Sequence, residues 1–124
     1  MKKINMDNKE FSKQLELRTK KVAISIIKMS AFLPNTPEGR VIRYQLSKSG
    51  TSVGANYREA NRSRSKADFK NKIKICESEA SETVYWLEII EVLTWVESKK
   101  LQIILTEANE LLAIYTSISK NLKL

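Results

Sequence analysis

The stretch that decides the fold runs from residue 47 to residue 87 and reads SKSGTSVGANYREANRSRSKADFKNKIKICESEASETVYWL. Apolar residues recur every three or four positions on both sides of a short basic turn, which predicts two consecutive helices. Ser65 followed three residues later by Asp68 is typical of a helix start. Gly50 and Gly54 fall inside the first helix, where each costs about 1 kcal/mol relative to alanine. We expect close approach of a neighbouring helix to offset this cost, and a break near Gly50 is the alternative.

Two further helices flank this pair. The first is predicted from Asp7, a capping residue, to just before Pro34, because a residue preceding proline is pushed out of the helical conformation. Thr36 and Pro37 then mark the start of the second helix. The third is expected to run from near Ser65 to about Val96, and the fourth follows a short turn around Ser98.

These helices share one pattern, an apolar stripe that faces inward. The inward positions are Phe11, Leu15, Val22, Ile26, Met29 and Leu33 in the first helix; Ile42, Leu46, Ser49, Val53, Tyr57 and Ala60 in the second; Phe69, Ile73, Cys76, Ala80, Thr83, Leu87 and Ile90 in the third; and Leu101, Ile104, Leu105, Ala108, Leu111, Leu112, Tyr115, Ile118 and Leu122 in the fourth. Short connections favour an all-α, antiparallel up-down-up-down four-helix bundle, with residues 1–124 forming one domain.

The composition limits the chemistry. The 124 residues include no histidine and one cysteine, Cys76. The absence of histidine removes the commonest general base and the usual imidazole ligand. Cys76, on an inward stripe, is expected to be an inert small hydrophobe. We therefore expect a non-enzymatic protein without a cofactor or metal. A single cysteine and the lack of a membrane-spanning run predict a cytoplasmic location.

Charge is unevenly distributed along the chain. Residues 1–74 contain 18 Lys and Arg against 6 Asp and Glu, whereas residues 75–124 contain 4 against 8. This asymmetry predicts a basic face that binds RNA or DNA through phosphates, without base stacking; a merely solvated face is the alternative. The predicted contacts are Arg58, Arg62, Arg64, Lys66, Lys70, Lys74, Lys20 and Lys21, with Lys13, Arg18 and Lys28 adding to the basic character of the first helix.

Polar residues also interrupt the apolar pattern of the middle helices. Asn56, Glu59, Lys72, Glu79 and Glu82 are predicted to form a structural hydrogen-bonded network, because a buried carboxylate without partners is unfavourable. A metal site is the alternative, although the usual carboxylate–histidine motif of bundle metal sites is missing.

The second half of the third helix, VYWLEIIEVLTWV at residues 84–96, is apolar nearly all the way round. A helix of this kind either occupies the centre of the bundle or contacts another subunit. Because its large side chains cannot all face one interior, we predict an oligomer interface that includes Trp86, Ile89, Val92 and Trp95.

The same central segment resembles the four-helix-bundle family named after proteins encoded in 23S rRNA intervening sequences. The matching positions are the run SVGAN at 52–56, Glu59 and Ala60, the arginine-serine turn that ends at Phe69, Lys72, Glu79 and Ala80, Glu82 and Thr83, and Trp86 and Leu87. The resemblance implies a bundle that assembles as a homopentamer with a nucleic-acid role, and despite the family name it does not imply a ribosomal protein.

A related group within this fold is similar in its basic charge. It comprises the accessory variability proteins of diversity-generating retroelements, pentameric bundles that bind a reverse transcriptase and its RNA. The alternative function is therefore a protein-interaction scaffold, such as an accessory subunit of a reverse transcriptase.

Overall fold

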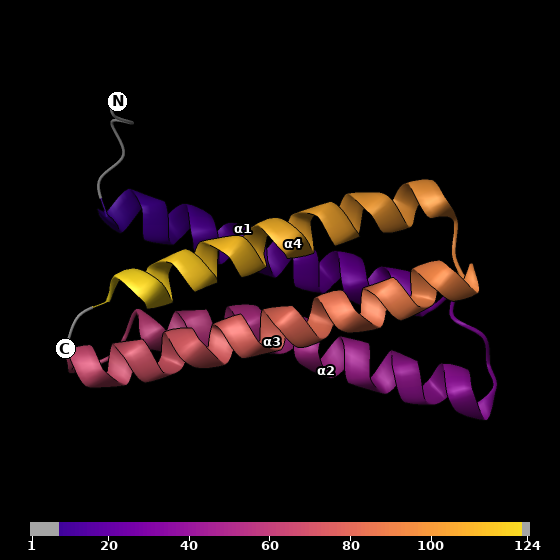
Figure 1. Ribbon diagram of the computed structural model, residues 1–124, viewed down its shortest axis with the longest axis horizontal. Coiled ribbons are helices and arrows are strands. Elements are labelled where there is room, and N and C mark those ends of the chain that lie inside the picture. The colour runs from indigo at the N-terminus through magenta and orange to yellow at the C-terminus, as the bar shows by residue number, and fades with distance from the viewer. Residues whose placement is uncertain (1–7, 123–124) are drawn as a thin grey trace.

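Four α-helices make up most of residues 8–122, the part of the chain that the computed structural model describes (Figure 1). They are α1 (Asn8–Ser30), α2 (Pro37–Ala60), α3 (Lys66–Leu93) and α4 (Ser98–Asn121). No strand occurs within these residues. The predicted all-α class with four helices is therefore confirmed.

The starts of α2 and α3 follow the predicted capping chemistry. The Thr36 hydroxyl accepts a hydrogen bond from the Gly39 amide at 3.0 Å, and Pro37 occupies the first turn of α2. The Ser65 hydroxyl accepts from the Asp68 amide, also at 3.0 Å. Each bond satisfies one of the amides that have no partner at a helix start. Asp7, the cap expected for the first helix, lies outside the described residues.

The end of α3 differs from the prediction. The helix ends at Leu93 rather than near Val96, and Thr94 takes the left-handed conformation with φ 54°. This conformation turns the chain, so that Trp95 and Val96 pack against the hydrophobic core instead of extending the helix. The turn is made without glycine, the residue that usually adopts this conformation at a helix end.

The chain reverses at each connection, and consecutive helices lie side by side (Figure 1). Between α2 and α3, the Thr83 hydroxyl bonds the Ser49 hydroxyl at 3.0 Å and the Cys76 thiol donates to the carbonyl of Val53 at 3.5 Å. Within the described residues α1 packs against α2 and, sparsely, against α4, but not against α3. The two helices α1 and α3 are therefore diagonal neighbours in the bundle.

The glycines of α2 mark the closest helix–helix contact. A Cβ atom at Gly50 would lie 2.6 Å from Cδ1 of Ile26, and one at Gly54 would lie 2.9 Å from Oγ1 of Thr19. Both distances are shorter than van der Waals contact, so these positions have no room for a side chain. The expected close approach of a neighbouring helix is confirmed, and the alternative of a break near Gly50 is wrong because α2 is continuous.

Nearly all predicted inward positions are buried or half-buried. Phe11 is the exception, with 40% of its surface exposed. The reason lies in the packing of α1, which contacts α2 extensively and α4 only sparsely. The first turn of α1 is therefore poorly covered.

Candidate nucleic-acid interface

The basic residues predicted from the central stretch lie around the α2–α3 connection, at the end of the bundle where α1 begins and α4 ends (Figure 1). Arg58 lies in the last turn of α2, Arg62 and Arg64 lie in the connection, and Lys66 begins α3. The amides of Arg62 and Ser63 each donate at 3.0 Å to carbonyls of the last turn of α2. These bonds fix the backbone that presents the arginines. Lys70 and Lys74 follow one and two turns along α3.

Most of these cations are exposed and have no ionic partner among the residues that the structure describes. Arg62, Arg64, Lys66 and Lys74 are exposed, and Lys70 is half-buried. Within residues 8–122, Arg58 is the member of this set that forms an ion pair, with 3.8 Å between its Nε and Oε1 of Glu16. An exposed pair at this distance contributes little to stability. The charges at this end are therefore available to an anionic partner.

A hollow of about 460 Å³ lies at the start of α3. It is lined by Ser63, Arg64, Ser65, Lys66, Phe69, Asn121 and Leu122. The free amides and the dipole of a helix N-terminus favour anions, which adds to the field of Arg64 and Lys66. Phe69, the aromatic residue of this segment, packs against the core, so it offers no exposed platform for stacking a base.

Lys20 extends the basic end along α1. It lines a groove between α1 and α2 together with Arg58 and Glu59, above the close contact at Gly54. Lys21 is also exposed but does not line this groove. The structure thus brings Lys20 and Arg58 together and leaves Lys21 apart from them.

Arg18 differs from the other basic residues of α1. Its guanidinium bonds both carboxylate oxygens of Glu107 on α4, at 2.8 and 2.7 Å, and one oxygen of Glu110 at 2.8 Å. Its hydrogen bonds with these carboxylates raise the pKa of Arg18 further above its ordinary value. Arg18 therefore serves the sparse α1–α4 contact and is not part of a free basic face.

The hydrogen bonds and ion pairs among residues 8–122 do not join the five residues predicted as one polar network. The Asn56 amide donates to the carbonyl of Ser52 on its own helix at 2.8 Å, and the Glu82 carboxylate accepts from the Trp86 indole at 3.0 Å. Glu59 is exposed, and Lys72 and Glu79 are half-buried. Burial and the neighbouring Glu82 charge raise the pKa of Glu79, whereas Lys48 of α2 lowers it.

The remaining reactive group is the thiol of Cys76. It is fully buried, and desolvation raises its pKa to about 12. A thiol in this state is a poor nucleophile at neutral pH, and its burial is the one expected of a small hydrophobe of the core. Within residues 8–122 no three Cys, Asp or Glu side chains converge in a way that could hold a metal ion. No helix in the same range is long and apolar enough to cross a bilayer.

Comparison with known protein families matches the model described as the 23S rRNA-intervening sequence protein over residues 9–117. The chain belongs to this family. A search of the solved structures finds a similar protein of unknown function from the S23 ribosomal protein family of Bacteroides thetaiotaomicron. That protein is 34% identical, and the match covers 86% of this chain and 99% of the other with a TM-score of 0.79. The search of curated proteins found no match.

The 23S rRNA-intervening sequence resemblance rested on the segment from residue 52 to residue 87, and the structure assigns physical roles to several of its positions. Gly54 permits the contact with Thr19 of α1, and Ser65 caps α3. Thr83 bonds Ser49 across the α2–α3 contact. Gly54 and Thr83 therefore hold neighbouring helices together and Ser65 begins α3, whereas the arginines of the matching turn belong to the exposed basic end.

The apolar side chains predicted to form a subunit interface lie in different environments. Val92 is 81% exposed, whereas Trp86 and Ile89 are half-buried. The Trp86 ring meets the ring of Tyr85 edge-on, with 5.0 Å between their centres. Trp95 is half-buried and lies beyond the end of α3.

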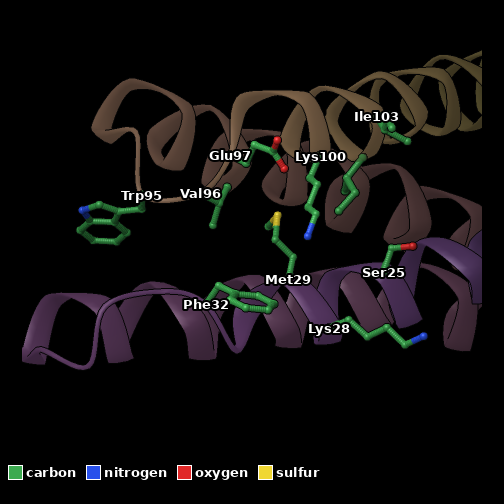
Figure 2. Close-up of a pocket in the computed structure, with 10 residues that line it drawn as sticks. Ser25, Lys28, Met29, Phe32, Trp95, Val96, Glu97, Lys100 and Ile103 are labelled. Atoms are coloured by element: carbon green, nitrogen blue, oxygen red, sulfur yellow. The ribbon is translucent and has the colours of Figure 1, made fainter.

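Trp95 lines an apolar groove that the sequence did not reveal. The groove has a volume of about 530 Å³ and lies between the end of α1 and the start of α4, where Met29, Phe32 and Ile103 also line it (Figure 2). The Lys100 ammonium lies 5.5 Å from the centre of the Phe32 ring, within the range of a cation–π contact. A mainly apolar groove, bordered by Lys28, Glu97 and Lys100, therefore lies at the end of the bundle opposite the basic residues.

Proposed function

We propose that this chain is a non-enzymatic cytoplasmic protein that works as a homo-oligomer of antiparallel up-down-up-down bundles and binds RNA or DNA through phosphates. The observation that carries the proposal is the cluster of cations at the α2–α3 end. Residues 58–74 include seven basic and two acidic residues, and one of the seven has an ionic partner within residues 8–122. Membership of a family named after an rRNA intervening sequence also supports a function in nucleic-acid binding.

Phosphate recognition is favoured over base recognition by the side chains that are present. Arginine and lysine bind phosphate oxygens, and the amides at the start of α3 add donors of the same kind. Within residues 58–74 the aromatic side chain is Phe69, which packs against the core and so offers no platform for stacking a base. We therefore expect binding that is insensitive to base sequence and strongly sensitive to salt.

The test is the salt dependence of binding, measured by fluorescence anisotropy with RNA and DNA of unrelated sequences. Replacing Arg62, Arg64, Lys66 and Lys70 with glutamine should weaken binding to all probes alike. If each cation contacts one phosphate, the slope of log K against log salt should fall by about 3 to 4, at about 0.9 per phosphate.

A charge-matched control separates this site from a general effect of net charge. Replacing Arg40, Lys48, Lys99 and Lys100 with glutamine removes the same charge away from the α2–α3 connection, and it should change the slope much less. An equal fall in the salt slope of both variants would show that the basic end is not the binding site. Absence of any retention at low salt would refute the nucleic-acid function altogether.

The second candidate is a protein-interaction scaffold, such as a subunit that accompanies a reverse transcriptase. The apolar groove lined by Met29, Phe32, Trp95 and Ile103 favours it, because phosphate contacts leave this surface unused (Figure 2). The scaffold function would be supported instead if this chain failed to bind nucleic acid and captured a reverse transcriptase through this groove. Replacing Phe32 with serine should then abolish capture without changing the fold.

A further inference from the structure

The outer face of α1 carries a second apolar stripe. Leu17, Ile24 and Ile27 are 55%, 45% and 52% exposed, and their spacing of seven and three places them on one face of the helix. They cannot serve the core, because the buried residues of α1 lie on a different stripe. Lys20 and Lys28 flank them, and α1 contains six basic and two acidic residues.

The outer face of α3 carries another apolar stripe, which is bordered by negative charge where the α1 stripe is bordered by positive charge. Tyr85, Ile89 and Val92 follow at spacings of four and three, and Tyr85 and Val92 are 55% and 81% exposed. Glu82 and Glu88 flank this stripe. Residues 77–93 contain five glutamates and no lysine or arginine. The α3 stripe is therefore an apolar strip with an acidic border.

The two stripes lie on opposite sides of one protomer. Within the described residues α1 and α3 do not pack against each other, since α2 and α4 separate them. Neither stripe can therefore cover the other within a single copy. Each stripe has three large apolar residues at its centre, and the lysines beside one are opposite in charge to the glutamates beside the other.

We propose that the outer face of α1 in one copy docks on the outer face of α3 in a second copy of this chain. This inference deepens the proposed function, since it rests on the homo-oligomer and names the surfaces that form it. The apolar centres exclude water and supply affinity, whereas the bordering charges select the partner face and the register. Lys20 then belongs to the subunit contact and not to the phosphate contacts.

The contact is heterologous, because each copy offers two different surfaces. Every copy in the assembly uses both faces, so the same contact repeats and closes into a ring if the rotation between copies allows it. A heterologous contact makes a prediction that a two-fold symmetric contact does not make. Two copies that each lack a different face should form one contact and then stop.

The experiment uses three double variants of the full chain, each exchanging two exposed or partly exposed apolar residues for aspartate. The α1 variant carries Ile24→Asp and Ile27→Asp, and the α3 variant carries Tyr85→Asp and Val92→Asp. The control carries Val41→Asp and Tyr44→Asp, which are 57% and 63% exposed and lie outside both stripes and outside the apolar groove. Circular dichroism checks the fold, and native mass spectrometry with sedimentation reports the assembly.

The wild type and the control should share the same multimeric mass, and the α1 and α3 variants should each have the mass of one chain. An equimolar mixture of those two variants should give a complex of two chains and nothing larger. Retention of the wild-type mass by either variant, or a mixture that stays monomeric or forms the full assembly, would overturn the inference while leaving the oligomer itself standing. A monomeric wild type would refute the proposed assembly, and this contact with it.

Discussion

Replacing Gly54 with alanine tests whether the contact between α1 and α2 sets the stability of the bundle. The new Cβ atom would lie 2.9 Å from Oγ1 and 3.1 Å from Cβ of Thr19. Thr19 is 1% exposed, and its hydroxyl donates to the carbonyl of Glu16 at 2.9 Å. A β-branched side chain in a helix has few rotamers. The clash is therefore relieved mainly by moving α1 away from α2.

Two opposing effects determine the magnitude. Overpacking a well-packed interior costs about 1–3 kcal/mol, whereas exchanging glycine for alanine within a helix gains about 1 kcal/mol. The net expectation for Gly54→Ala is a loss of about 1 kcal/mol in the free energy of unfolding. Thr19→Ala removes the hydroxyl that lies nearest to the new atom. In that background Gly54→Ala should be less destabilising, because the 2.9 Å contact is gone while the 3.1 Å contact with the Cβ atom of residue 19 remains, which is a coupling of about 1 kcal/mol between the two positions.

The assay is urea unfolding followed by circular dichroism at one fixed protomer concentration, because assembly makes stability depend on concentration. Asn71→Ala, at an exposed position inside α3, calibrates the gain from helix propensity alone. The reasoning is refuted if Gly54→Ala stabilises the wild type by the full propensity gain. It is equally refuted if Thr19→Ala leaves the effect of Gly54→Ala unchanged.

Three further predictions follow from single side chains. Gly39→Ala should lower the free energy of unfolding by about 3 kcal/mol in the same assay, because its Cβ atom would lie 1.9 Å from the carbonyl oxygen of Pro34, a backbone atom that cannot rotate away. This cost exceeds the one expected for Gly54→Ala, and an equal or smaller cost would contradict the geometry. Burial and the Glu82 charge raise the pKa of Glu79 above its ordinary 4.5, so the folded state binds this proton more tightly and stability falls as the pH rises from 4.5 through the raised pKa. Glu79→Gln should remove that fall and raise the melting temperature at neutral pH, and a parallel pH profile of the two proteins would argue against it. The Cys76 thiol, fully buried with its pKa raised to about 12, should be alkylated only when urea unfolds the chain, as mass spectrometry would show, and rapid modification of the native protein would contradict its burial.

The features that sequence predicted best are those determined by local chemistry. Thr36 and Ser65 identify helix starts because a short polar side chain reaches the amide three residues ahead. Gly50 and Gly54 indicated a close neighbour because glycine is unfavourable inside a helix unless something offsets it. These signals need no knowledge of the partner helix.

The features that sequence missed depend on segments far away in the chain. Arg18 cannot be told from the neighbouring lysines until Glu107, 89 residues further on, is placed beside it. The end of α3 at Leu93 follows from the packing of Trp95 and Val96, and the local sequence offers no glycine or proline to mark it. Asn56 bonds its own helix instead of the expected carboxylates, because side-chain spacing does not say which neighbouring helix a polar residue meets.

The second stripe of α1 carried a usable signal that the inward pattern concealed. Leu17, Ile24 and Ile27 are apolar yet fall off the stripe that contains Leu15 and Val22. A single core-facing stripe accounts for one side of a bundle helix. A second apolar stripe on the far side therefore indicates a partner outside the protomer, and the helical spacing of these three residues is enough to place them there.

The two proposals make a joint prediction about binding strength. Rotation about one ring axis carries every copy onto the next, so the same end of each bundle faces the same side of the ring. The α2–α3 ends would then gather on one face, and a nucleic acid long enough to cross several copies would meet several basic ends at once. Linked contacts of this kind raise affinity without any new contact chemistry, and each added phosphate contact steepens the salt dependence.

The α1 variant with Ile24→Asp and Ile27→Asp isolates this effect, because it keeps Arg62, Arg64 and Lys66 intact at the basic end. Its affinity for a long RNA or DNA should fall, and its salt slope should become shallower than that of the wild type. For a probe that spans one bundle, the affinities of the variant and the wild type should be similar once the two added negative charges per chain are allowed for. The Val41→Asp and Tyr44→Asp control adds the same charge to an assembled protein, so it supplies that allowance in the same anisotropy titration. Identical slopes for the α1 variant and this control on the long probe would show that assembly does not gather the basic ends, and one of the two proposed surfaces would then have to be reassigned.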